Sequence, residues 1–257
     1  MIKAQQSKQK NNVENTPIKL SVVVPVFNEL ENVGFLIEEI QATLNNIVSY
    51  EMIFIDDCSD DGTFEELIKI KNKVKTLRVL SHKRRSGQSA AVRSGVKAAR
   101  GTLVATLDGD GQNNPSDIPS LLAAYEDPTN VASNVMICGQ RANRRDSIIK
   151  RLSSRIANRI RSSLLGDSAL DSGCGLKLFS VDDFMELPSF DHMHRFLPAL
   201  VIRSGGKVIS IKVSHRSRER GKSKYGVFDR LWVGIFDLFG MVWLKCRSIN
   251  PEVNESR

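Results

Sequence analysis

The sequence predicts an α/β fold in which helices flank a mostly parallel, doubly wound sheet. Short apolar runs rich in β-branched residues alternate with segments of helical periodicity. The connections between them are short, and polar residues directly follow several of the runs. Because such sheets bind ligands beyond the carboxyl ends of their strands, we expect a ligand site where these polar residues gather.

The first half of the chain shows this alternation most clearly. Residues 19–27 (KLSVVVPVF) form an apolar run typical of a buried strand, and residues 30–46 then carry apolar side chains at the helical period. Further strands are expected at residues 52–55, 77–80, 103–107 and 135–138. Further helices are expected at residues 63–75, 87–100 and 117–125.

A basic amphipathic helix is expected at residues 147–165 (SIIKRLSSRIANRIRSSLL). Leu152 and Ile156 share its apolar face, whereas Arg155 lies on the opposite side and Arg159 at the boundary. Such a helix is typical of a membrane surface or a partner interface. A helix on the domain surface with a solvated charged side is the alternative.

The last hydrophobic element, residues 225–243, predicts an interfacial or docking helix. Its apolar part, residues 231–244, contains Asp237 and is shorter than the roughly 20 residues that span a bilayer. Trp232 and Trp243 suit a membrane surface or a membrane partner, and a buried core helix is the alternative. We expect neither a transmembrane segment nor a signal peptide.

The remaining elements are an apolar segment at residues 175–179, a helix around residues 195–203 and a strand at residues 208–213. The expected divisions are a disordered polar tail at residues 1–18, one α/β domain at residues 19–224, and a C-terminal helix and tail at residues 225–257.

Composition narrows the class of partner. The chain has 257 residues and a net charge of +8, which favours an anionic partner. Only 6% of residues are aromatic and basic residues do not interleave with them, so nucleic acid is not expected. The four cysteines form no CxxC pair and the histidines fit no zinc pattern, which suggests reduced thiols of a cytosolic protein.

The most informative motif is Asp108-Gly109-Asp110-Gly111-Gln112. It follows the strand expected at residues 103–107 and precedes a helix start at Pro115. Carboxylate and amide oxygens at this spacing suit a hard Mg²⁺ or Mn²⁺ ion, which also prefers phosphate oxygens as ligands. The motif therefore predicts a metal-bridged nucleotide site, and a solvated turn is the alternative.

Three motifs in order resemble the signatures of family 2 glycosyltransferases of the GT-A fold. They are Val24-Pro25-Val26-Phe27-Asn28-Glu29, Asp56-Asp57-Cys58-Ser59-Asp60-Asp61-Gly62-Thr63 and Asp108-Gly109-Asp110-Gly111-Gln112. Within that family the chain most resembles the polyprenol-phosphate (dolichol-phosphate) mannosyltransferase group. Further motifs carry this resemblance: Gly139-Gln140-Arg141, Asp171-Ser172-Gly173-Cys174-Gly175-Leu176-Lys177, His194-Arg195-Phe196-Leu197-Pro198 and Arg218-Glu219-Arg220-Gly221-Lys222-Ser223-Lys224-Tyr225-Gly226.

The resemblance implies a role for each matching residue. The residues implied to bind the nucleotide sugar are Pro25, Phe27, Glu29, Ile55, Asp57, Asp108 and Gly109. The implied metal ligands for Mg²⁺ or Mn²⁺ are Asp110 and Gln112. The residues implied to act on the donor phosphates and the reacting groups are Asp110, Arg141, Arg218 and Lys224. Residues expected at the acceptor phosphate or the membrane are Arg155, Arg159 and Ser223.

The implied reaction moves one sugar from a nucleotide diphosphate sugar, such as GDP-mannose or UDP-glucose, to polyprenyl phosphate, with inversion. A lipid monophosphate is already an anionic nucleophile, so no strong general base is required. We therefore expect a peripheral enzyme on the inner face of the cytoplasmic membrane, attached directly or through a small integral-membrane partner. The alternatives are a soluble family 2 transferase with a saccharide or protein acceptor, a nucleotidyltransferase, and a regulatory module that binds nucleic acid.

Overall fold

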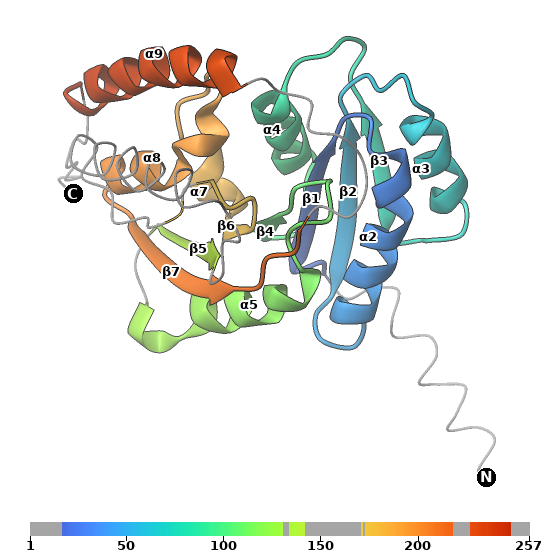
Figure 1. Cartoon of the computed structure of the whole chain (residues 1–257). Coiled ribbons are helices and arrows are strands. Elements are labelled where there is room, and N and C mark those ends of the chain that lie inside the picture. The colour runs from blue at the N-terminus through green and yellow to red at the C-terminus, as the bar shows by residue number, and fades with distance from the viewer. Residues whose placement is uncertain (1–16, 131–133, 142–170, 172, 218–226, 248–257) are drawn as a thin grey trace, which may run out of the picture.

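A seven-stranded sheet forms the centre of the molecule. The computed structural model describes residues 17–130, 134–141, 171, 173–217 and 227–247. The strands are arranged in the order β3-β2-β1-β4-β6-β5-β7 (Figure 1). Their bounds are β1 Leu20–Val26, β2 Tyr50–Asp56, β3 Leu77–Ser81, β4 Leu103–Thr106, β5 Val135–Arg141, β6 Lys177–Ser180 and β7 Lys207–Val213.

The sheet is mostly parallel, as predicted, and β6 is the exception. β1 pairs in parallel with both β2 and β4, β2 with β3, and β5 with β7. β6 lies between β4 and β5 and runs antiparallel to both. A segment before β6 therefore reaches the sheet at the same edge at which the chain leaves β4.

Helices cover both faces of the sheet and bury two apolar layers. Alternate strand residues point to opposite layers, so Val22 and Val24 face one and Val23 faces the other. The helices of the first layer are α2 (Leu30–Leu44), α3 (Thr63–Lys71) and α5 (Ile118–Glu126). Those of the second layer are α4 (Gln88–Ala98), α7 (Val181–Met185), α8 (Leu197–Arg203) and α9 (Val227–Lys245).

Most expected elements are present close to the bounds read from the sequence. The helix expected around residues 195–203 is divided into a 3₁₀ turn, Met193–Arg195, and α8. The helix expected at residues 225–243 is α9, whereas residues 147–165 lie outside the described residues. In the described part of the chain, no helix combines the length and apolarity needed to cross a bilayer.

A buried carboxylate links neighbouring strands at the amino edge of the sheet. Glu51 in β2 is 2% exposed. Its Oε1 accepts hydrogen bonds from Ser21 Oγ (2.7 Å) and the Arg100 backbone N–H (2.6 Å). Its Oε2 accepts one from Arg78 Nη1 at 2.7 Å. This group joins β1, β2, β3 and the start of the loop before β4.

We predict that Glu51→Ala lowers the free energy of unfolding by about 3 kcal/mol, because it leaves Arg78 without its counter-charge and Ser21 and the Arg100 N–H without their acceptor. The matched control is Glu126→Ala, which removes an exposed ion pair with Lys19 and should cost less than about 1 kcal/mol. Urea denaturation followed by circular dichroism measures both. Equal losses in the two variants would contradict the structural role of Glu51.

Candidate active site

Asp57 holds the loop between β3 and α4 at the carboxyl end of β2. Its Oδ1 accepts hydrogen bonds from His82 Nδ1 (2.7 Å) and the Ser86 backbone N–H (2.8 Å), and its Oδ2 accepts one from the Gly87 N–H (2.8 Å). A carboxylate offers roughly four acceptor positions. Asp57 therefore fixes this loop and keeps capacity for one more donor.

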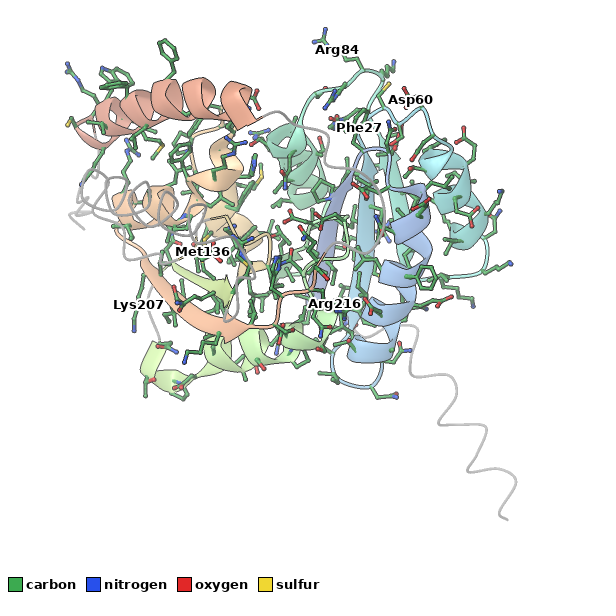
Figure 2. The ribbon with its side chains drawn as sticks, in the orientation of Figure 1. Phe27, Asp60, Arg84, Met136, Lys207 and Arg216 are labelled. Atoms are coloured by element: carbon green, nitrogen blue, oxygen red, sulfur yellow. The ribbon has the colours of Figure 1, made fainter. Side chains whose placement is uncertain are left out.

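The loops that follow β1 and β2 contact each other at the carboxyl edge of the sheet. Asn28 has a positive φ of 54°. Its Nδ2 donates to Asp60 Oδ1 (2.6 Å), and the Asp60 backbone N–H donates to Asn28 Oδ1 (2.9 Å). Beside this pair the Arg85 guanidinium lies 4.1 Å from the ring centre of Phe27. Figure 2 shows Phe27 and Asp60 together at this end of the molecule. The ring face of Phe27 thus accepts a flat polar group.

Three other residues expected to line the nucleotide pocket lie in different surroundings. Pro25 is partly exposed near the end of β1. Glu29 is buried, and its Oε2 accepts a hydrogen bond from Asn32 Nδ2 at 2.6 Å. Ile55 is fully buried in the layer beneath α4, between β1 and β3, and exposes no surface there.

Asp108 is confined by its neighbours. Gln88 Nε2 at the start of α4 donates to its Oδ1 at 2.8 Å. The backbone of Gly175 passes so close that a Cβ there would lie 2.2 Å from Asp108 Oδ2. Burial, and next the charge of Asp110, raise the pKa of Asp108 to about 6, while the charge of Lys177 acts in the opposite direction. A cation at this point would relieve the repulsion between the two carboxyl groups.

The rest of the motif is ordered by backbone contacts. Gly109 packs against β1, because a Cβ there would lie 2.7 Å from Val26 Cγ1 and 2.9 Å from the carbonyl oxygen of Pro25. The Gln112 backbone N–H donates to Asp110 Oδ1 at 3.1 Å. Asp108, Asp110 and Gln112 are thus presented from one short loop after β4.

A buried ion pair lies beside this loop. Arg141, at the end of β5, donates to both carboxylate oxygens of Asp171, with Nε to Oδ2 at 2.6 Å and Nη2 to Oδ1 at 2.7 Å. Lys177, the first residue of β6, is 4% exposed and donates to the carbonyl oxygen of Cys174. Both cations act electrostatically on Asp108, so positive charge surrounds the acidic loop.

The structure brings together one part of the predicted site. The residues gathered at the carboxyl edge are Phe27, Asp57, Asp108, Gly109, Asp110, Gln112 and Arg141. The remaining site residues, which lie outside the described residues, are Arg155, Arg159, Arg218, Ser223 and Lys224. Neighbours without an assigned site role in the sequence are Gln88, Asp171, Gly175 and Lys177. Gln88 reaches Asp108 from the start of α4. The other three come from the segment that leads into β6, so their contact with Asp108 and Arg141 depends on the direction of that strand.

His194 links the turn before α8 to the start of α4. Ser89 Oγ accepts a hydrogen bond from the His194 backbone N–H (3.2 Å) and shares a second hydrogen bond with His194 Nδ1 (2.7 Å). Burial, and next the charge of Arg195, lower the pKa of His194 to about 3. The imidazole is therefore neutral, and its hydrogen bonds with Ser89 connect these two segments.

This pKa predicts a loss of stability in mild acid. The unfolded chain binds a proton near pH 6.5, whereas the folded chain binds it only near pH 3. His194 therefore does not lower the free energy of unfolding above pH 6.5. As the pH falls below that value the free energy of unfolding decreases, by about 2 kcal/mol at pH 5. His194→Gln should lose less free energy of unfolding than the wild type between pH 7 and pH 5. Urea titrations at the two pH values would refute the neutral imidazole if both proteins lose the same amount.

Few side chains in the described part of the chain are placed to bind a metal ion. Among the residues that the structure describes, no three or more histidine, cysteine, aspartate or glutamate side chains form a group able to hold a metal ion. Asp108, Asp110 and Gln112 nevertheless present hard oxygen donors in an acidic loop. This fits an ion of the Mg²⁺ type, which is commonly held by one or two carboxylates together with substrate phosphates.

Solved structures of one sugar-transferring enzyme have a similar fold. The structure matches glucosyl-3-phosphoglycerate synthase from Mycobacterium tuberculosis in complex with Mg²⁺ and uridine diphosphate, with a TM-score of 0.65 and 17% identity. That match covers 97% of this chain and 85% of the other. The same enzyme with Mn²⁺, uridine diphosphate and glucosyl-3-phosphoglycerate gives a TM-score of 0.66 at 18% identity. The predicted GT-A fold is thereby confirmed.

Proteins found by sequence comparison share a higher identity with this chain than these solved structures do. A dodecaprenyl-phosphate galacturonate synthase from Rhizobium johnstonii is 36% identical over 242 residues, which are 91% of this chain and 69% of that protein. An undecaprenyl-phosphate 4-deoxy-4-formamido-L-arabinose transferase from Photorhabdus laumondii is 33% identical over 235 residues, with the same two shares covered. The family model described as "Glycosyl transferase family 2" matches residues 21–187. The chain therefore belongs to glycosyl transferase family 2.

Proposed function

We propose that this glycosyltransferase moves a single sugar from a nucleotide diphosphate sugar to a polyprenyl phosphate, with inversion at the anomeric carbon. The observation that carries the proposal is the similarity, over nine-tenths of the chain, to transferases whose names specify dodecaprenyl or undecaprenyl phosphate. The acidic loop at the carboxyl edge of the sheet supports it, because a diphosphate leaving group needs a cation there.

The nucleotide would bind over the ends of β1 and β2. The ring of Phe27 offers a face for the base, in the position that Arg85 now covers. Asp57 has capacity for one further donor, such as a base N–H. Asp108 and Gly109 then follow at the end of β4, next to the ribose and the diphosphate. In this proposal Pro25, Glu29 and Ile55 support the pocket from β1, its following loop and β2.

Asp110 and Gln112 would hold Mg²⁺ or Mn²⁺ together with diphosphate oxygens. When bound, the ion neutralises negative charge that develops on the leaving diphosphate. The chain's own contribution is to hold these ligands on a loop fixed between β1 and Gly175. Arg141 adds a cation whose orientation is set by its two hydrogen bonds to Asp171.

The acceptor needs little activation. A lipid monophosphate is anionic near neutral pH, so its oxygen can attack the anomeric carbon while the bond to the diphosphate breaks. The protein must therefore bring two anions together, which requires basic side chains. We propose the basic residues Arg155, Arg159, Arg218 and Lys224 for this task, with the Ser223 hydroxyl as a further hydrogen-bond donor to the acceptor phosphate, on the basis of their motifs.

Transfer to a lipid should be directly measurable. We predict that the purified protein, with Mn²⁺ and labelled UDP- or GDP-sugars, gives a labelled lipid when undecaprenyl phosphate in detergent is added. Asp110→Ala should lower the rate about a hundredfold, because it removes a stabiliser of leaving-group charge. Gly175→Ala should do likewise, because its Cβ would displace the Asp108 carboxyl group.

The matched control is Gly34→Ala in α2, where a Cβ has room, since its nearest neighbour would be 3.9 Å away. This variant should keep the wild-type rate. Product that forms only on a soluble saccharide or protein acceptor would contradict the lipid proposal. It would support the alternative of a transferase with a soluble acceptor.

We further propose that α9 attaches the enzyme directly to the inner face of the cytoplasmic membrane. Leu238, Met241 and Val242 pack into the second apolar layer. Phe236 and Trp243 on other turns of the helix are 73% and 62% exposed, and Phe239 is 71% exposed. The positions of these three aromatic residues, 236, 239 and 243, fall on one face of a helix.

The charge near this aromatic face suits an anionic lipid surface. Exposed Lys245 and Arg247 follow it at the end of α9. Figure 1 shows α9 at the same end of the molecule as the loop after β3, which carries Arg84 in Figure 2. Cations beside an exposed aromatic stripe favour a membrane surface with anionic headgroups.

We predict that the wild type sediments with phosphatidylglycerol vesicles and that Phe236→Ser/Phe239→Ser/Trp243→Ser lowers the affinity at least tenfold, because three apolar side chains no longer leave water. The control is Phe35→Ser, which removes a 55% exposed aromatic residue on α2. A wild type that stays in solution with every vesicle would refute direct attachment. In that case the aromatic face would be assigned to an integral-membrane partner.

A further inference from the structure

The chain after β7 is joined to the loop that carries Gln112. The Ser214 backbone N–H and hydroxyl both donate to Asp117 Oδ2, at 2.9 and 2.6 Å. The next residue, His215, forms an isolated antiparallel bridge with Asn113. The loop after β4 and the segment after β7 therefore lie side by side, although they are about a hundred residues apart in the sequence.

The Arg216 side chain adds two further contacts at this junction. Its Nη1 donates to Glu39 Oε1 on α2 at 2.6 Å, and its Nη2 donates to Asn114 Oδ1 at 2.7 Å. Asn114 in turn accepts a hydrogen bond from the Ser116 N–H and caps the short helix before α5. The planar guanidinium thus ties α2 to the start of α5, with two directed, charge-assisted bonds. Figure 2 shows Arg216 at this position.

The same residue orients Gln112 through its backbone. The Arg216 N–H donates to the Gln112 carbonyl oxygen at 3.0 Å, and Gln112 Nε2 donates to the Arg216 carbonyl oxygen at 3.4 Å. The Gln112 N–H is bound to Asp110 Oδ1. With both its nitrogens and its backbone carbonyl engaged, Gln112 presents its side-chain Oε1 away from Arg216. That oxygen is the atom of an amide that binds a hard cation.

From this geometry we infer that Arg216, held by Glu39 and Asn114, is a positioning residue that aims Gln112 Oε1 at the divalent ion. This inference rests on the proposed metal site and adds residues that no motif assigns to it. A group that orients a metal ligand acts on metal affinity, and its loss typically costs tenfold or more. Both hydrogen bonds of the Arg216 guanidinium described above go to protein groups, Glu39 and Asn114, so we expect its replacement to leave donor binding without metal unaffected.

The test measures Mn²⁺ binding by electron paramagnetic resonance in the presence of UDP, with GDP in parallel. Arg216→Gln should raise the dissociation constant for Mn²⁺ about tenfold. Glu39→Gln should also raise this dissociation constant. The double variant should bind Mn²⁺ no more weakly than Arg216→Gln alone, since both substitutions remove the same Arg216–Glu39 contact. Lys212→Gln, an exposed lysine on β7, is the matched control and should match the wild type.

A second comparison separates positioning from general destabilisation. In a Gln112→Ala background, Arg216→Gln should cause no further loss of Mn²⁺ affinity, and UDP binding without metal should be the same in all variants. An unchanged dissociation constant in Arg216→Gln, or an equal loss in both backgrounds, would overturn the positioning role while leaving sugar transfer intact. A wild type that binds no Mn²⁺ with either nucleotide would overturn the metal site as well, whereas the lipid assay tests the transfer reaction separately.

Discussion

The antiparallel direction of β6 is the constraint on which the site depends. Because β6 runs against β4 and β5, the segment before it arrives at the carboxyl edge, where Asp108 leaves β4. Gly175 then lies against the Asp108 carboxyl group, and Thr106 Oγ1 donates to the Gly175 carbonyl oxygen at 2.6 Å. A parallel β6 would carry the same residues to the opposite edge. The direction of this one strand thus decides whether Gly175 and Lys177 meet the acidic loop.

The carboxylates at the two edges of the sheet, buried Glu51 and partly buried Asp108, have different surroundings. Glu51 at the amino edge is bound by a cation, a hydroxyl and a backbone N–H, so its charge is compensated within the protein. Asp108 at the carboxyl edge lies close to Asp110, and burial together with that charge raises its pKa. Compensation there is incomplete, which is the condition under which a site gains from an added cation. The contrast separates a fully compensated carboxylate from one that an added cation would stabilise.

The sequence predicts the elements and the acidic loop because their signals are local. Periodicity identifies α2, and β-branched runs identify β1, within a few residues of the observed bounds. Other features have no local signal. The burial of Ile55, the packing of Arg85 on Phe27 and the contacts of Arg216 depend on how distant segments pack. The types of side chain therefore indicate which chemistry the chain can perform, whereas the order of the strands decides which of these side chains lie together in one site.

The attachment of α9 to the domain bears on how a lipid could reach such a site. His192 Nδ1 lies 3.0 Å from Asp237 Oδ2 on α9, and Arg203 Nε donates to the Leu244 carbonyl oxygen at 2.9 Å. These contacts come from the turn before α8 and from α8 itself, and Met241 is buried between them and the sheet. The helix is therefore docked on one side while its aromatic side remains exposed. A membrane bound by that side would meet the domain in one fixed orientation, which would keep the acceptor phosphate at a constant depth relative to Asp110.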